Sequence, residues 1–359
     1  MAFKQYDHRP GFLDIELSNV IDKSRTHKFL SEVDLCINWE PLEEIVTSNY
    51  PVGQSTYGNR AYPPLMLLKA ILLQKWFSIQ SDPELETQIN DRISFKTFVG
   101  LPLADPSPDH SIICRFRERV GRDTLEAIHH ELLTQLNAQG FSIESGMAVD
   151  ARIVKSSSRP VSDKKLKALR AKRKAKAQQR KKTRQSMRFE RDLASDWTVK
   201  NNKPVFGMKE HAAIDVTSGL VLSTMVSKAS EHDTNYLQYV VTKAIHGNNL
   251  PPKVYADKGY SGRPNRDFLS MNGISDGIMR KNQINASLTD AEIQRNKKIS
   301  KVRYKIEQYF GITSKYHGAG KARFTTIMKE NWDHLSGAMA FNIKRAVLAK
   351  RREVNMAAV

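Results

Sequence analysis

Cysteine is nearly absent from this chain, which has only Cys36 and Cys114 in 359 residues. Two cysteines cannot build a disulfide framework or a cysteine-rich zinc site, so both are excluded. Long apolar runs are also missing: the longest candidate, residues 64–73, contains Lys69 and falls short of the ~18 residues that a membrane span needs. The first ten residues lack the apolar core of a secretory signal. We therefore expect a cytoplasmic protein.

Acidic residues are the scarcer charged residues, with 38 Asp and Glu against 57 Lys and Arg and a formal net charge of +19. The hydrophobic content of 40% is typical of a globular protein and argues against wholesale disorder. Much of the excess charge lies between Lys164 and Arg191, where 28 residues include fourteen Lys or Arg and one acid. This segment is either a nucleic-acid contact or a solvated loop. Its charge density favours nucleic acid and does not distinguish DNA from RNA.

Residues 62–138 carry the signals of several short helices. One helix is expected after Pro63 and Pro64, a second after a Ser81 cap, and a short third over residues 94–99. Two more are expected over residues 111–120 and 123–138. This pattern suits either a helix-turn-helix-like DNA-binding module or a helical bundle for dimerisation. Arg115 and Arg119 are four residues apart and could face DNA together.

From about residue 146 short apolar strands alternate with helices, which predicts a three-layer α/β domain. Asp150 and Asp257 each follow a short apolar strand, and Glu307 lies on a long helix that begins near Thr289. Buried carboxylates are costly unless they are paired or bind a cation, and three of them in a basic protein suit Mg²⁺. Each acid taken alone is more simply interpreted as a turn carboxylate at a strand end or as one partner of a surface ion pair on a helix, and the spacing of three acids does not by itself prove a site. The expected strands are residues 146–156, 205–215, 220–227, 253–256 and 277–280, and the expected helices are 236–246, 267–272 and 289–309.

Two weaker candidates lie between the first two acids. Lys209 and His211 alternate on one strand, so they share a face and could approach the same site. Asp233 belongs to a Glu-His-Asp triplet that resembles a metal cluster, but Asp233 or Thr234 more simply caps the helix that follows.

Several sequence blocks, in order over about 290 residues, resemble one family. They are YPPLMLLKAILLQKW, DRISFKTFVGLPL, SPDHSIICRFRERV, GMAVDARIVKSSS, FGMKEHAAIDVTSGLVLSTMVSKASEHD, VYADKGYSG and RYKIEQYFG. The chain resembles a DDE transposase of a bacterial insertion sequence, of the insertion-sequence-five group within the larger insertion-sequence-four-like superfamily. The resemblance implies an α/β fold: a ribonuclease-H-like catalytic domain preceded by an all-helical N-terminal DNA-binding or dimerisation domain. The expected divisions are an arm over 1–60, the helical domain over 61–140, the catalytic domain over 141–350 with a basic insertion at 160–200, and a tail over 351–359.

The resemblance also implies the site. The three metal-binding catalytic acids carry over to Asp150, Asp257 and Glu307, which would hold two Mg²⁺ ions, with Mn²⁺ as a substitute. A phosphate-gripping Arg carries over to Arg303, whereas the family's Tyr and Lys positions are Ser300 and Ser314 here. The residues expected to bind DNA are Arg303, Lys258, Tyr260, Lys315, Lys172, Arg173, Lys174, Arg180, Lys181, Lys182, Arg115 and Arg119.

The implied activity is cleavage at the terminal inverted repeats of an insertion sequence and joining of the freed 3′-hydroxyls to target DNA. The partners are double-stranded DNA and at least one further copy of the chain in a synaptic complex, in the bacterial cytoplasm at the nucleoid. Two alternatives remain open at this point. One is a catalytically silent DNA-binding regulator derived from a transposase, and the other is a metal-dependent DNA endonuclease.

Overall fold

The structure is a computed structural model that describes residues 3–6, 23–53, 59–141, 146–180, 192–245, 250–282 and 286–357. The chain divides into two compact units, residues 1–142 with 335–359 and residues 143–334. The sequence prediction kept residues up to 350 with the second unit, whereas the contacts assign the chain from Leu335 onward to the first. Among the described residues, no helix combines the length and the apolar character needed to cross a membrane.

The first unit is built from helices packed around α4. Nearly every residue of α4 is buried, as its apolar sequence predicts, and the Trp76 indole at its end donates a hydrogen bond to the Ala340 carbonyl oxygen at 2.8 Å. The expected arm over residues 1–60 contains two helices. The helices are α2 (Arg25–Cys36), α3 (Trp39–Ser48), α4 (Pro64–Trp76), α5 (Asp82–Asp91), α6 (Ile93–Val99), α7 (His110–Ala138) and the greater part of α12 (Ile327–Ala357).

Local sequence signals explain where these helices begin and end. The Ser81 hydroxyl accepts a hydrogen bond from the Glu84 amide and caps α5. Gly100 ends α6 in the left-handed region, with φ +76°, which glycine adopts without strain. The two helices predicted over 111–120 and 123–138 form one element, α7, that is interrupted at Gly121 by φ +70° and ψ 179°.

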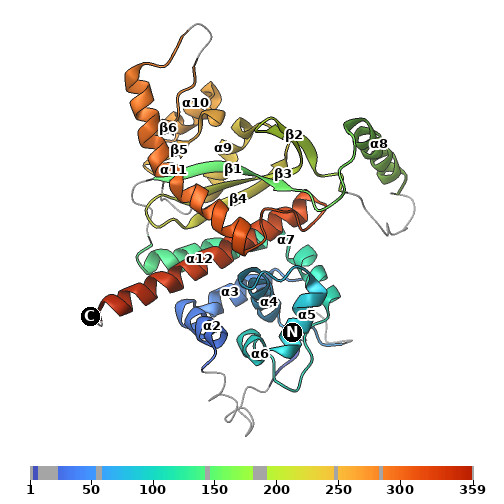
Figure 1. The fold of residues 1–359 in the computed structure, drawn as a ribbon. Coiled ribbons are helices and arrows are strands. Elements are labelled where there is room, and N and C mark those ends of the chain that lie inside the picture. The colour runs from blue at the N-terminus through green and yellow to red at the C-terminus, as the bar shows by residue number, and fades with distance from the viewer. Residues whose placement is uncertain are drawn as a thin grey trace. The chain divides into compact units, whose positions relative to one another are not determined.

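The second unit is built around a six-stranded sheet in the order β2-β3-β1-β5-β6, with β4 also paired to β3 (Figure 1). The strand β3 runs antiparallel to β1, β2 and β4, whereas β1, β5 and β6 run parallel to one another. The expected strand set is present, and β2 is an additional strand that the sequence did not predict. The strands are β1 (Met147–Lys155), β2 (Asp196–Lys200), β3 (Lys203–Asp215), β4 (Val221–Lys228), β5 (Lys253–Ala256) and β6 (Ser275–Ile278).

Helices cover both faces of this sheet, which makes the unit a mixed α/β structure. On β3, Glu210 contacts Tyr309 of α11, and the next residue, His211, stacks on Tyr236 just before α9. Because neighbouring side chains of a strand point to opposite faces, α11 and α9 lie on opposite sides. The helical elements are α8 (Asp163–Arg180), η1 (Asp233–Tyr236), α9 (Leu237–Ala244), η2 (Lys258–Tyr260), α10 (Arg263–Met271) and α11 (Asp290–Tyr316), followed by the first turns of α12.

Candidate active site

Asp150 and Asp257 lie side by side because their strands are adjacent and parallel. Val149 of β1 pairs with Ala256 of β5, and each acid is the next residue along its chain. The Asp150 side chain is 20% exposed and that of Asp257 is 40% exposed. Burial raises the pKa of Asp150, although the Arg303 guanidinium and the Ala151 amide both favour its charged form. Asp150 thus lies within β1, at the level where β5 ends, and Asp257 is the residue directly after β5.

Arg303 of α11 reaches both carboxylates. Its Nη2 lies 2.5 Å from Asp150 Oδ2, and its Nη1 lies 3.7 Å from Asp257 Oδ1. The Arg303 side chain is 8% exposed, and its buried Nε has no hydrogen-bond partner within the part of the chain that the structure describes. The position of α11 is fixed at its start by Thr289 and Glu292, which form a capping box. A cation held between two acids offsets the cost of bringing their charges together.

Glu307 lies one helical turn after Arg303, on an exposed part of α11. Its carboxylate makes no hydrogen bond or ion pair with the residues that the structure describes, so it forms no ion pair with Arg303 along the helix surface. The ligand oxygens of Asp150, Asp257 and Glu307 do not all lie within 4.8 Å of one another. The three acids thus share one region of the unit, with two of them in contact with Arg303.

A buried polar network holds α11 against the sheet beyond the acids. Glu210 is fully buried and accepts hydrogen bonds from Arg152 Nε at 2.6 Å and from the Tyr309 hydroxyl at 2.9 Å. His334 Nδ1 lies 3.1 Å from the same carboxylate. Although burial opposes ionisation, Arg152 and His334 lower the pKa of Glu210 to about 2, and Glu210 with Glu330 raises that of His334 to about 9.

The other residues of this unit that are predicted to bind DNA differ in their exposure to solvent. Lys258 is exposed directly after Asp257. Tyr260 is only 1% exposed, and its buried hydroxyl has no hydrogen-bond partner among the described residues, so in this structure it is not at the surface where DNA would bind. Lys315 is exposed near the end of α11, beside the ring of Tyr316. Ser314, the position at which the resemblance drawn from the sequence implies a Lys, instead accepts a hydrogen bond from Arg152 at 2.8 Å.

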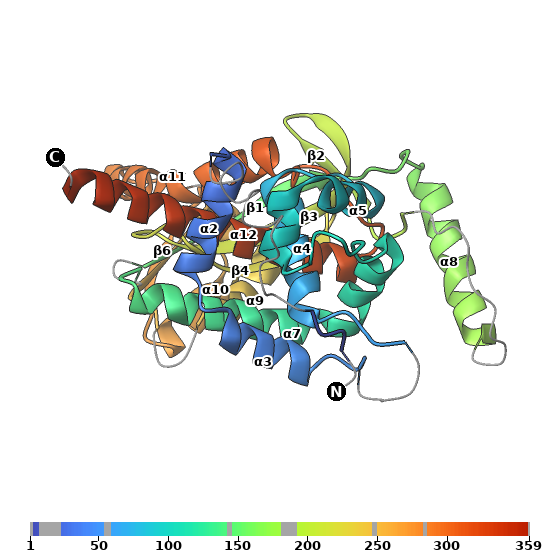
Figure 2. The same cartoon turned by 90° about the horizontal axis from the view of Figure 1, so that it is seen from below.

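The basic insertion begins as α8, which stands apart from the sheet (Figures 1 and 2). Arg170 fixes its base by donating to the Leu193 and Ser195 carbonyl oxygens at 3.0 Å each, with Asp196 at 3.3 Å. Lys172 and Lys174 are exposed and Arg173 is half-buried. Lys181 and Lys182 lie outside the described residues, as does the side chain of Arg180.

In the helical unit, the arginines of α7 separate by role. Arg115 and Arg119 are exposed, as a DNA-facing pair requires. Arg117 is buried and forms an ion pair with Asp82 at 2.7 Å, so it serves the packing of α5 against α7. A Glu86, Asp109 and His110 group is the one set of His, Cys, Asp or Glu among the described residues whose ligand atoms lie within 4.8 Å. Asp109 also caps α7 there, so this surface group is distinct from the predicted acids.

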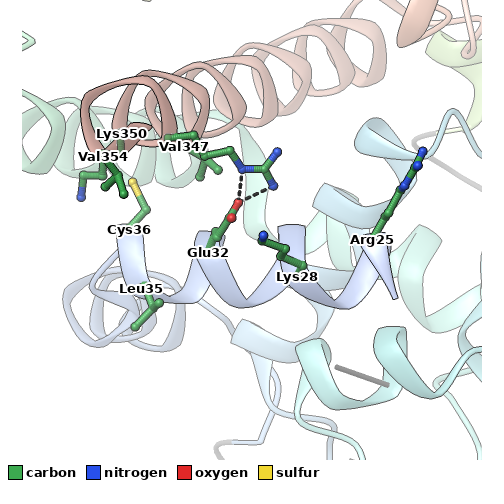
Figure 3. Close-up of a pocket in the computed structure, with 9 residues that line it drawn as sticks. Arg25, Lys28, Glu32, Leu35, Cys36, Val347, Lys350 and Val354 are labelled. Carbon is green, nitrogen blue, oxygen red and sulfur yellow. Dashed lines mark hydrogen bonds and ion pairs between the residues drawn. The ribbon is translucent and has the colours of Figure 1, made fainter. Parts of the chain in front are cut away.

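A pocket of about 510 Å³ in the helical unit lies between α2 and α12 (Figure 3). Glu32 and Arg351 form an ion pair across it, and burial raises the pKa of Cys36. Basic side chains border the pocket, including Arg25, Lys28 and Lys350. It contains no residue of the predicted site.

In the second unit, the contacts that the sequence did not predict involve Asp233. The predicted cap of the helix after this residue is wrong, because His232 Nδ1 accepts the Thr234 amide at 3.4 Å. The Asp233 carboxylate instead binds Lys209 Nζ at 2.9 Å. The alternate spacing of Lys209 and His211 was a correct signal for a shared face, but His211 is a buried residue bonded to Ser227.

Two family models match this chain. A family model described as "Transposase DDE domain" matches residues 142–327, which is more than half of the chain, and one described as "Transposase domain (DUF772)" matches residues 17–119. The chain therefore belongs to the DDE transposase family. Among solved structures it is similar to a piggyBac transposase synaptic complex with hairpin DNA, at 11% identity and a TM-score of 0.37. That match covers 90% of this chain and 76% of the other.

Proposed function

We propose that this transposase binds the terminal inverted repeats of an insertion sequence of the insertion-sequence-five group, cleaves the ends and joins the 3′-hydroxyls to target DNA. The observation that carries the proposal is the placement of Asp150, within β1, beside Asp257, which directly follows the adjacent parallel strand β5, with Arg303 reaching both from the helix that bears Glu307. The strand order, with two antiparallel pairings followed by two parallel ones, supports a ribonuclease-H-like catalytic unit.

The donor set fits a hard divalent cation, because it consists of carboxylate oxygens with partial access to solvent. Asp150, Asp257 and Glu307 would hold two Mg²⁺ or Mn²⁺ ions. When bound, such ions activate the attacking oxygen and stabilise the leaving oxygen of an in-line phosphoryl transfer. Arg303 orients the two aspartates, and the exposed lysines of α8 position duplex DNA through its phosphates.

The test uses Asp150→Ala, Asp257→Ala and Glu307→Ala, each assayed for binding and cleavage of a duplex that carries the element's end. Each variant should lose cleavage by at least about a hundredfold and keep its DNA affinity, because a metal ligand is removed rather than a DNA contact. Asp267→Ala, an exposed acid on α10 paired with Arg263 at 3.6 Å, is the matched control and should cleave normally. Wild-type cleavage by any one of the three would remove that residue from the site.

A further inference from the structure

A fourth acid borders the site on the other side of Asp257. A methyl group placed on Gly259 would lie 3.9 Å from Asp233 Oδ2 and 4.0 Å from Asp257 Oδ2. The two carboxylates therefore face the same small space beside η2. Tyr260 is buried next to Gly259, and burial together with the carboxylates of Asp150 and Asp233 raises the pKa of its hydroxyl, so this hydroxyl lies within electrostatic range of both acids. Asp233 is thus part of the same electrostatic cluster as the catalytic acids.

Asp233 holds a lysine at this edge. Lys209 Nζ donates to Asp233 Oδ1 at 2.9 Å and to the Glu231 carbonyl oxygen at 2.8 Å. The Lys209 side chain is 15% exposed and that of Asp233 is 32% exposed, so the pair is confined but open to solvent. An ammonium group has three N–H donors, and those two contacts use two of them. Within the described part of the chain, the third N–H has no acceptor.

The surrounding charges explain why a lysine is held there. A DNA strand that approaches Asp150 and Asp257 brings phosphates towards carboxylates, and like charges repel. A lysine fixed at the edge of the acids supplies an attractive contact for a phosphate at no further ordering cost, since its side chain is already restrained. An unrestrained surface lysine would lose most of that advantage through side-chain entropy.

We propose that Lys209 binds a backbone phosphate of the reacting DNA strand and that Asp233 is the positioning residue that holds Lys209 in place. The proposal rests on the proposed function, because it requires DNA at the catalytic acids. Lys209 thereby provides, from strand β3, a fixed cation beside the acids.

The experiment measures affinity for the element's end duplex in Ca²⁺, which supports binding without cleavage. Phosphates around the cleavage position are neutralised one at a time as methylphosphonates. In the wild type, one such replacement should lower the affinity about tenfold, as expected for one charge-assisted hydrogen bond. Lys209→Gln should bind the unmodified duplex about tenfold more weakly and show no further loss at that phosphate. For Lys209→Gln, a plot of log affinity against log salt concentration should have a slope that is shallower by about 0.9 than that of the wild type.

The control variants distinguish a lysine that contacts DNA from a Lys209–Asp233 ion pair that only stabilises the fold. Lys203→Gln removes the same charge from an exposed position on the same strand and should keep the full penalty at the sensitive phosphate. Asp233→Asn leaves Lys209 charged but less firmly held, so it should reduce that penalty without changing the salt slope. If Lys209→Gln lowers the unfolding midpoint, Asp233→Asn becomes the deciding variant. If Asp233→Asn loses as much affinity as the wild type when the sensitive phosphate is neutralised, the proposal is wrong.

The remaining outcomes distinguish this inference from the proposed function. If the wild type binds the end duplex and Lys209→Gln is equally sensitive at every phosphate, the pair is structural and the inference alone is wrong. If the wild type has no preference for the end duplex, the proposed function fails and the inference fails with it.

Discussion

Arg303 places one guanidinium group against two carboxylates that would otherwise repel each other. It does so from a buried position, where a lone Asp150 charge would be costly. This arrangement revises the role expected from the sequence, in which Arg303 grips a DNA phosphate. In the structure its Nη2 is committed to Asp150, so we propose that it first orders the acids.

Arg303→Lys should therefore lower the cleavage rate about ten- to hundredfold, because a single ammonium cannot reach both carboxylates as the planar fork does. Single-turnover cleavage of the end duplex measures the effect. Arg295→Lys is the matched control on the same helix: Arg295 donates to the Ile278 and Asp276 carbonyl oxygens at 2.8 Å each, away from the acids. A normal rate for Arg303→Lys would show that the guanidinium fork is not required.

At the scale of elements, the buried network links β1, β3, α11 and α12 through Glu210. His334 contributes two contacts to it, with Glu210 at 3.1 Å and with Glu330 at 3.4 Å. The raised pKa of His334 and the lowered pKa of Glu210 have a shared cause, the ion pair between the two residues. The stabilisation that follows from the two shifts is therefore counted once. The network fixes the part of α11 that follows Glu307.

This pairing predicts how stability depends on pH. His334 has a folded pKa of about 9 against an ordinary value of 6.5. Its contribution is complete below pH 6.5 and is lost as the pH rises through 9, at a cost on the order of 1–3 kcal/mol. The Glu210 contribution is present above pH 4.5 and is lost as the pH falls towards 2.

Hydrogen exchange of the β3 amides, measured between pH 6.5 and 9.5 and corrected for intrinsic rates, reports this local stability. The wild type should lose protection over that range, and His334→Gln should start with less protection and show little further loss. His232→Gln, an exposed histidine of the same unit, should behave as the wild type. Protection in the wild type that stays constant with pH would mean that His334 is neutral in the folded protein.

The helix α8 carries the prediction about charge. If about six basic residues of the segment Lys164–Arg191, which begins in α8, engage phosphates, log affinity for duplex DNA should fall with log salt at a slope near −5. Changing Lys172, Arg173, Lys174, Arg180, Lys181 and Lys182 to Gln should flatten the slope and weaken binding to end and scrambled duplexes alike, because phosphate contacts carry no sequence information. Arg170→Gln, which loosens the base of α8 while removing one charge, should change the slope by at most about 1. An unchanged slope in the six-residue variant would identify the segment Lys164–Arg191 as a solvated tether.

The apolar strands and the capped helix α11 follow directly from the sequence because their signals are local. Alternating or continuous apolar runs mark β1, β3 and β5, and Thr289 with Glu292 marks the start of α11. The helix α12 was missed because buried polar residues such as Asn331, His334 and Asn342 interrupt its apolar pattern. Their partners lie far away in the sequence, and so does the Asp233 partner of Lys209, so no periodicity could reveal these contacts.

At the scale of the whole molecule, the helical unit and the sheet unit bring different capacities to transposition. The helical unit offers Arg115 and Arg119 as an exposed pair, and the sheet unit offers the acids with their associated cations. Joining two element ends to a target requires at least two copies of the chain, which predicts a dimer in the synaptic complex. Sequence-specific binding by the helical unit would leave the sheet unit free to act at any phosphate presented to it.

One measurement tests the central claim most directly. A labelled duplex that carries the element's end with a free 3′-hydroxyl is incubated with the protein, Mg²⁺ and supercoiled plasmid. We expect the label to become covalently joined to the plasmid, with no joining when the 3′ end is a dideoxynucleotide or when Asp150 is changed to Ala. Plasmid cutting without joining would make the protein an endonuclease, and binding without either reaction would make it a silent regulator; both results would contradict the proposed transposase.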